Sequence, residues 1–233
     1  MKNKKFYPWL VVALLWVVAL LNYMDRQMLS TMQAAMKVDI VELQQAEAFG
    51  ALMAVFLWIY GIVSPFAGIV ADRISRKKLV VGSLFVWSLV TYLMGYASSF
   101  DQLYMLRALM GISEALYIPS ALSLIADWHE GKSRSLAIGV HMTGLYVGQA
   151  IGGFGATVAA AFSWHTAFHW FGILGIAYSV VLLFLLHDKD KDTADVTVAQ
   201  QEKTAKGGLF QGLSVVLSTW AFWVILFYFA VPS

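Results

Sequence analysis

Long apolar runs alternate with short polar connections along most of this chain. Each run is close to the roughly 20 residues that an α-helix needs to cross a bilayer. The pattern predicts six spans, the first from about residue 6 to the mid-thirties and the others at about 47–70, 79–98, 102–126, 135–161 and 167–187. We therefore predict an all-α membrane protein in which residues 1–187 form a six-helix transmembrane bundle.

The pattern changes abruptly after residue 187. Residues 188–212 are rich in Asp, Lys, Gln and Thr, which is typical of a solvated linker. A seventh apolar run follows at about 213–231, and the chain stops at Ser233 without a polar tail. We expect 188–212 to be a cytoplasmic linker and 213–233 to be the first helix of a C-terminal bundle, in a chain that looks truncated.

Composition supports a membrane protein. Of the 233 residues, 60% are hydrophobic and only 13% are charged, whereas ordinary soluble domains carry about 25% charged residues. The mean hydropathy is +0.69. The chain has no cysteine, which excludes disulfides and thiolate metal sites.

Lysine and arginine are distributed unevenly between the two sides of the predicted bundle. The basic residues of one side are Lys2, Lys4, Lys5, Arg73, Arg76, Lys77, Lys78, Lys132, Arg134, Lys189, Lys191, Lys203 and Lys206. The connections on the other side hold only Lys37. By the positive-inside rule the N-terminus and the linker are cytoplasmic, which predicts a multi-pass protein of the cell (inner) membrane.

The fourth run contains a cation and an anion, Arg107 and Glu114, seven residues apart. This spacing places both on one helix face, roughly 10 Å apart along the axis. A charge at membrane depth costs about 2.5–3.5 kcal/mol on insertion scales and is tolerated when it faces a bundle interior or a watery cavity. Glu114 lies far from both ends of its span, so we expect it to be protonated, paired or hydrated. It is our first candidate for proton coupling, and a static ion pair with Arg107 or Arg26 is the structural alternative.

The first run ends with a second pair of charges, Asp25 and Arg26. Two interpretations stay open: a helix-end pair at the outer headgroups, or a cavity pair near mid-depth. Arg107 has the same choice, because it can extend outward to the membrane surface. If both arginines face a cavity, their planar guanidinium groups suit a carboxylate or phosphate. Candidate hydroxyl and amide contacts come from Asn22, Tyr23, Tyr60 and Tyr117, although membrane aromatics more often serve packing.

The fifth run carries glycines at four-residue spacing, Gly144, Gly148 and Gly152. Such a stripe lets two helix backbones approach closely, so we interpret it mainly as a packing surface. His141 and Gln149 lie in the same segment, and the spacing does not decide which of them faces a cavity.

Several function classes find no support in the sequence. The five histidines show no metal-ligand arrangement, and we predict neither a metal nor a cofactor. The absence of a Gly-Lys-Ser/Thr loop disfavours an ATP-driven pump. The basic cluster at 73–78 is too short to indicate nucleic acid, and no nucleophile–base pattern indicates an enzyme. The expected partners are therefore the lipid bilayer and a small solute.

The connection between the second and third runs resembles the signature loop of the major facilitator superfamily. It reads Gly68-Ile-Val-Ala-Asp72-Arg73-Ile-Ser-Arg76-Lys77-Lys78, and Ser75 replaces the usual second glycine. The resemblance implies twelve helices in two halves around a central cavity, with alternating access. It covers the first half, the linker and one helix of the second half, so a complete transporter would need the missing C-terminal half.

Two further motifs resemble the anion:cation symporters, which carry hexuronates and other organic anions. They are Asn22-Tyr23-x-Asp25-Arg26 and Arg107-x-x-x-Gly111-x-x-Glu114-Ala115-x-x-x-Pro119. The resemblance implies that Arg26 and Arg107 bind substrate or support its binding, and that Asp25 and Glu114 couple protons. We therefore hypothesise a proton-coupled carrier of a small organic anion, most plausibly a sugar acid. The alternatives are a spinster-like carrier of lysolipids or other amphiphiles, since that family shares these motifs, and a non-transporting membrane sensor.

The signature loop also suggests a gate, formed by Gly68, Asp72, Arg73, Arg76 and Lys77. Asp72 and the cations after it can bridge to neighbouring helix ends on the cytoplasmic side and so latch one state of the transporter. The alternative is that these cations only anchor the loop in the cytoplasm.

Overall fold

The computed structural model describes residues 6–189 and 218–220. The chain divides into two compact units, residues 1–189 and 190–233, and each is taken by itself. Most of the predicted linker and of the predicted seventh span lies outside the described residues. The domain boundaries at 187 and 212 therefore stay predictions.

The first unit is a bundle of α-helices, and no strand occurs in residues 6–189. Its helices are α1 (Tyr7–Thr31), α2 (Gln33–Asp39), α3 (Ala46–Arg73), α4 (Arg76–Met94), α5 (Phe100–Ala115), α6 (Tyr117–Trp128), α7 (Gly131–Gly152), α8 (Gly155–Ala161) and α9 (Trp164–Leu185), with a short 3₁₀ turn η1 (Val41–Gln44) before α3. All six predicted spans are helical, but the first, fourth and fifth are each divided into two helices.

Within the described residues, five segments are long and apolar enough to cross a membrane. They are Tyr7–Thr31, Ala46–Gly68, Arg76–Met94, Phe100–Trp128 and Trp164–Leu185. The predicted fifth span, made of α7 and α8, is not among them. It carries His141, Gln149 and several glycines, which make it less apolar than the other spans.

The division of the fourth span follows from a proline. Pro119 has no N–H, so it cannot bond the carbonyl of Ala115 four residues earlier, and its ring is displaced by that carbonyl. α5 accordingly ends at Ala115 and α6 starts at Tyr117. Glu114 thus lies in the last turn of α5, at the break in the middle of the span.

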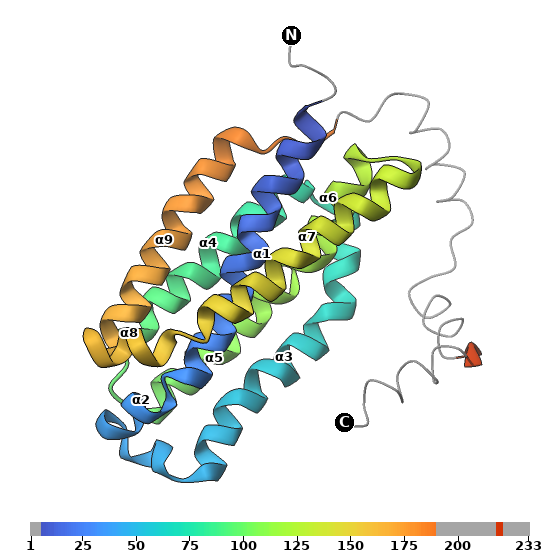
Figure 1. Ribbon diagram of the computed structural model, residues 1–233. Helices are drawn as coiled ribbons and strands as arrows, with labels where there is room; N and C mark the ends of the chain where they lie inside the picture. The colour runs from blue at the N-terminus through green and yellow to red at the C-terminus, as the bar shows by residue number, and fades with distance from the viewer. Residues whose placement is uncertain (1–5, 190–217, 221–233) are drawn as a thin grey trace. The chain divides into compact units, whose positions relative to one another are not determined.

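The glycine stripe of α7 packs against α1, as the sequence predicts (Figure 1). A Cβ atom on Gly144 would lie 2.6 Å from the carbonyl oxygen of Trp16, and one on Gly148 would overlap the carbonyl oxygen of Leu20. No larger side chain fits at these positions, because the two backbones are in contact. α1 is thereby held along much of its length.

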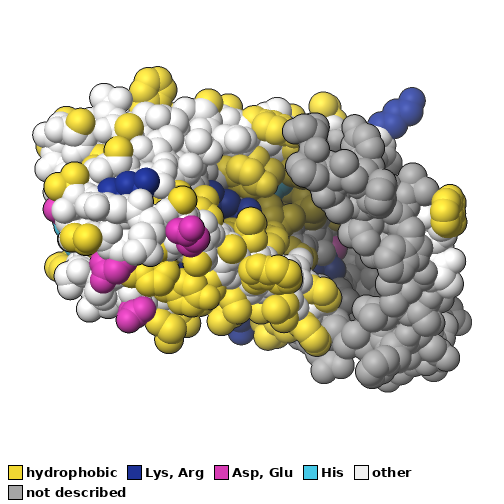
Figure 2. All heavy atoms as spheres, turned by 90° about the horizontal axis from the view of Figure 1, so that it is seen from below, with side chains coloured by type: hydrophobic (Ala, Val, Ile, Leu, Met, Phe, Trp, Pro, Cys, Tyr) yellow, Lys and Arg dark blue, Asp and Glu magenta, His cyan; other side chains and the backbone are white. Residues whose placement is uncertain are grey.

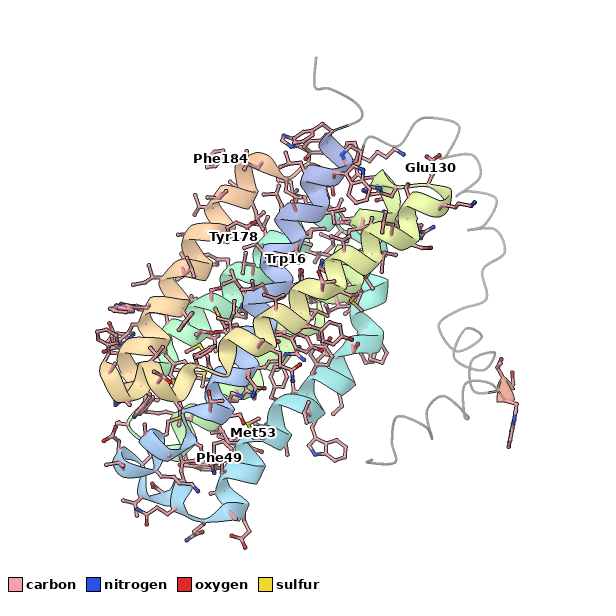
Figure 3. The ribbon with its side chains drawn as sticks, in the orientation of Figure 1. Trp16, Phe49, Met53, Glu130, Tyr178 and Phe184 are labelled. Atoms are coloured by element: carbon pink, nitrogen blue, oxygen red, sulfur yellow. The ribbon has the colours of Figure 1, made fainter. Side chains whose placement is uncertain are left out.

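The other helices pair around this core. α4 packs along α9, α3 packs along α5, and α4 also contacts α5 (Figure 1). Figure 3 labels two side chains that connect helices: the hydroxyl of Tyr178 donates to the Leu14 carbonyl at 2.9 Å, and the indole N–H of Trp16 donates to the Thr143 hydroxyl at 2.9 Å. Phe184, also labelled, points outward from α9 and is 69% exposed.

Apolar side chains cover much of the outer surface. Hydrophobic side chains occupy a large part of the face seen in Figure 2, and only a few acidic and basic side chains are scattered among them. The exposed large residues of α3 are Leu57, Trp58, Ile62 and Phe66. Such a surface is unfavourable in water and suits contact with lipid or with other apolar protein surface.

Candidate functional site

A buried ion pair joins α1 to α5. The Arg26 Nη2 atom lies 2.7 Å from Glu114 Oε2, and Arg26 Nε donates to the same oxygen at 2.8 Å. The Glu114 side chain is fully buried and that of Arg26 is 21% exposed. The second carboxylate oxygen, Oε1, has no hydrogen-bond partner among the described residues. One oxygen of the Glu114 carboxylate is therefore paired with Arg26, and the other is buried without a partner among the described residues.

Three aromatic rings surround the Arg26 guanidinium. Its Cζ atom lies 5.0 Å from the ring centroid of Tyr23, 4.7 Å from that of Phe56 and 4.9 Å from that of Tyr60. Tyr23 belongs to α1, and the other two rings come from α3. A cation over a ring face is attracted by the quadrupole of the ring. These rings therefore stabilise the charge of Arg26 without neutralising it.

Arg107 is buried, with 2% of its surface exposed, so it does not extend to the membrane surface. Its Cζ lies 4.4 Å from the ring centroid of Phe56, and its Nη1 donates to the sulfur of Met110 at 3.2 Å. Among the described side chains no carboxylate lies within ion-pair distance of this guanidinium, and its Nε has no hydrogen-bond partner there. Arg107 is thus a buried cation without an acidic partner in direct contact.

Asp25 is also buried, but it does not join the Arg26 pair. Its Oδ2 accepts a hydrogen bond from the hydroxyl of Thr91 on α4 at 3.0 Å. Glu114 and Arg107 are among its electrostatic neighbours. Asp25 therefore lies inside the bundle, in contact with α4.

Asn22, one turn before Arg26 on α1, is fully buried. Neither its amide nitrogen nor its amide oxygen has a hydrogen-bond partner within the described part of the chain. Buried amides are normally hydrogen-bonded, so these atoms are available to a ligand or to water.

The candidate gating residues lie away from this site, at the end of α3 and the start of α4. Arg76 at the start of α4 forms an ion pair with Asp127 at the end of α6, and its Nη1 donates to the Ser123 carbonyl at 3.4 Å. The backbone N–H of Lys77 donates to Asp188 Oδ1 at 2.9 Å. Gly68, Asp72 and Arg73 belong to the last turns of α3, and the side chains of Asp72 and Arg73 lie outside the described residues.

Some residues of these clusters do not appear among the sequence candidates, among them Phe56, Thr91 and Asp127. Phe56 had a usable signal, because it precedes Tyr60 by four residues and so shares its helix face. The other two carry no motif that marks them. Within residues 6–189 and 218–220, no three His, Cys, Asp or Glu side chains gather where they could hold a metal ion.

Comparison with known sequences identifies the relatives of this chain. The sequence model described as the Major Facilitator Superfamily matches residues 15–232. The hexuronate transporter of Bacillus subtilis is 27% identical over 84% of this chain and 46% of its own length. A protein named as a probable galactarate/D-glucarate transporter of Escherichia coli is 28% identical over 86% of this chain and 45% of its own length. The chain therefore spans less than half the length of these relatives, which are named as transporters rather than enzymes.

Solved structures show the same fold. The crystal structure of a bacterial homologue of the human lysosomal transporter Spinster, inward-facing and unoccupied, superposes with a TM-score of 0.69 at 22% identity. The match covers 82% of this chain and 45% of that one. The inward-facing, occupied form of such a homologue also gives 0.69, at 23% identity. At this level of identity the similarity concerns the fold alone.

Proposed function

The chain belongs to the Major Facilitator Superfamily, as a multi-pass membrane protein, and on that premise we propose a function for it. It is a proton-coupled secondary active transporter that carries a small organic anion, such as a hexuronate or another sugar acid. It works in the inner membrane with its N-terminus in the cytoplasm, an orientation that the distribution of lysine and arginine supports.

The observation that carries this proposal is the pairing of Arg26 with a fully buried Glu114 that keeps one oxygen open. A buried carboxylate beside a cation is stable while ionised, and the cation is released when the carboxylate takes up a proton. Protonation of Glu114 would therefore free the guanidinium fork of Arg26. A carboxylate of the substrate can then take the place of the Glu114 carboxylate, with two parallel N–H···O bonds.

This exchange couples the two solutes through charge. Arg26 holds one negative charge in either case, first from Glu114 and then from the substrate. An empty site with a protonated Glu114 leaves Arg26 without its counter-charge, which is unfavourable in a buried site. Proton and anion are therefore expected to bind together. Asp25 is the second candidate proton carrier, because it is buried close to the same charges.

The choice of a sugar acid has two supports. The relatives reported above are named as carriers of hexuronate and of galactarate or glucarate. The site also offers groups that suit a polyhydroxy acid, namely the hydroxyls of Tyr23 and Tyr60 around Arg26 and the unpartnered amide of Asn22. Arg107 adds a second positive charge.

The helix-end cluster is proposed as the gate. Arg76 belongs to the signature loop, and its ion pair with Asp127 connects the start of α4 to the end of α6. An ion pair between helix ends can hold one arrangement of the bundle and open in another. Gly68, Asp72, Arg73 and Lys77 are proposed as the other parts of this gate.

The test is uptake by the full-length protein in proteoliposomes that contain a pH-sensitive dye. Addition of glucuronate should acidify the lumen together with uptake of the labelled anion, and glucose should do neither. Glu114→Gln should abolish the proton signal, because its amide cannot carry a proton. Glu47→Gln, an exposed carboxylate in the first turn of α3, is the matched control and should behave as wild type.

Other outcomes identify other functions. Uptake of a neutral sugar without proton movement would refute the assignment. Competition by lysolipids but not by sugar acids would indicate an amphiphile carrier. Binding of the anion without any flux would indicate a membrane sensor. Anion uptake that requires a sodium gradient and brings no acidification would change the coupling ion while leaving the substrate class intact.

A further inference from the structure

One aromatic ring contacts both Arg26 and Arg107. The ring centroid of Phe56 lies 4.7 Å from Cζ of Arg26 and 4.4 Å from Cζ of Arg107. Phe56 comes from α3, Arg26 from α1 and Arg107 from α5, so the ring connects three helices. The side chain is 1% exposed.

A close helix contact holds the ring in place. Gly111 lies one turn after Arg107 on α5, and a Cβ atom there would be 2.9 Å from the Phe56 carbonyl oxygen and 3.2 Å from Cβ of Ile59. The backbones of α3 and α5 are therefore in close contact beside Phe56. This approach places the ring over Arg107 and leaves little room for it to move away.

The two arginines differ in the other groups that interact with their charge. Arg26 has Glu114 in direct contact, whereas Arg107 has the ring and the Met110 sulfur in contact and only more distant acids, Glu114 and Asp25. Two guanidiniums in one buried site repel each other. A ring face attracts each cation without cancelling its charge and without using the N–H groups at its edge. The positive charge of Arg107 thus stays available.

We infer that Phe56 is a positioning residue for anion binding: its ring holds both guanidiniums at the site without using their charge or their N–H donors, which the substrate needs. The inference rests on the proposed anion transport and deepens it. A carboxylate in place of the ring would neutralise Arg107 and compete with the substrate. An aliphatic side chain would fill the volume but leave Arg107 without an attractive partner, so the guanidinium would move toward the nearest acid.

The decisive experiment changes the ring electrostatics and leaves its shape nearly unchanged. Phe56 is replaced in the full-length protein by phenylalanine with one, two and three ring fluorines, which progressively weaken the negative ring face. Glucuronate binding is measured by calorimetry and uptake by radiotracer. The dissociation constant should rise stepwise, by about tenfold at three fluorines. KM should rise with it while the maximal rate changes little.

Phe168 provides the matched control. It is 2% exposed and packs edge-on against Trp164 at 5.9 Å, and within the described residues no cation lies over its ring. The same fluorine series at Phe168 should leave binding unchanged. Phe56→Leu should weaken binding as strongly as trifluorination or more, and Phe56→Tyr, which keeps a ring, should restore most of the affinity.

The outcomes separate this inference from the proposed function. Glucuronate binding that is equal across the Phe56 series would overturn the role of the ring and leave anion transport standing. If the wild type binds no sugar acid, the proposed function fails. The melting temperature of the ligand-free protein then decides whether the ring holds the cations: a stepwise fall at Phe56 alone supports it, and equal values for both series overturn it.

Discussion

Two arginine–acid pairs connect helices in this bundle, and their surroundings differ sharply. Arg26–Glu114 joins α1 to α5, with Glu114 fully buried and Arg26 21% exposed. Arg76–Asp127 joins α4 to α6 at the helix ends, where the two side chains are 21% and 33% exposed. The two pairs therefore differ in the burial of the acid rather than of the arginine. Aromatic rings surround the first pair, whereas the second has a backbone carbonyl as its further partner.

The difference teaches which property each pair can serve. Breaking a buried pair leaves one charge without compensation, so the inner pair has to stay matched, by Glu114 or by an incoming anion. Asp127 of the outer pair is 33% exposed, and a pair that water and salt can reach contributes about 0–1 kcal/mol, because solvent replaces the partner easily. The inner pair is therefore suited to couple charges, and the outer pair is suited to open and close. Substitutions at each pair can break or sharpen this contrast.

The largest effect is expected from removing one inner partner. Glu114→Leu should lower the free energy of unfolding by about 3–5 kcal/mol, because Arg26 is left buried without a counter-charge. Thermal and denaturant unfolding in detergent measures it. The double variant Arg26→Met/Glu114→Leu should recover most of the loss. Asp127→Leu serves as the outer counterpart, and an equal loss there would remove the contrast.

A smaller effect is expected from crowding the helix contact beside the inner pair. Gly111→Ala places a methyl group against the Phe56 carbonyl, and overpacking of this kind typically costs about 1–3 kcal/mol. The melting temperature of the variant and its affinity for glucuronate should both fall. Gly139→Ala on α7, where nothing lies within 4 Å of the new atom, is the control and should be neutral or slightly stabilising. Wild-type affinity in Gly111→Ala would contradict the tight positioning of Phe56.

At the outer pair we expect a change in rate more than in stability. Asp127→Asn should alter the free energy of unfolding by no more than about 1 kcal/mol, yet slow transport several-fold with unchanged substrate affinity. Uptake and calorimetric binding assays separate the two quantities. Asp72→Asn should act in the same direction, and the charge exchange Arg76→Asp/Asp127→Arg should restore part of the rate. Transport at the wild-type rate in both single variants would end the gating proposal.

The smallest effect concerns salt. Raising the ionic strength from about 0.15 M to about 1 M shortens the screening length from about 8 Å to about 3 Å. The stability difference between wild type and Asp127→Asn should therefore shrink, while that between wild type and Glu114→Leu should persist. Unfolding curves at the two salt concentrations make the comparison. A loss of both differences would place the inner pair in contact with bulk solvent.

Much of this architecture is predictable from sequence. Apolar run length placed all six helical spans of the first unit, and the four-residue spacing of Gly144, Gly148 and Gly152 predicted a close helix contact, which packing against α1 confirms. The signature loop predicted the Major Facilitator Superfamily, which the match over residues 15–232 confirms. These signals are local or periodic, so they survive in a single sequence.

Contacts between helices are harder to predict from the sequence. The sequence left open whether Glu114 pairs with Arg107 or with Arg26, and the structure selects Arg26. The seven-residue spacing predicts that Arg107 and Glu114 lie on the same helix face, but it does not predict which residue of a neighbouring helix contacts them. The hydrogen bond from Thr91 to Asp25 and the pair between Arg76 and Asp127 depend in the same way on how α4 sits against α1 and α6.

By itself, the amino-acid sequence determined that this protein is a helical membrane bundle with ionisable groups inside its apolar segments, because hydrophobic length and charge position are properties of each segment alone. The tertiary structure alone decided that Glu114 compensates Arg26 and that Phe56 is shared by both arginines. Those contacts depend on the relative placement of α1, α3 and α5, which is set by the close packing of helices far apart in the chain, for example where Gly111 admits the Phe56 backbone.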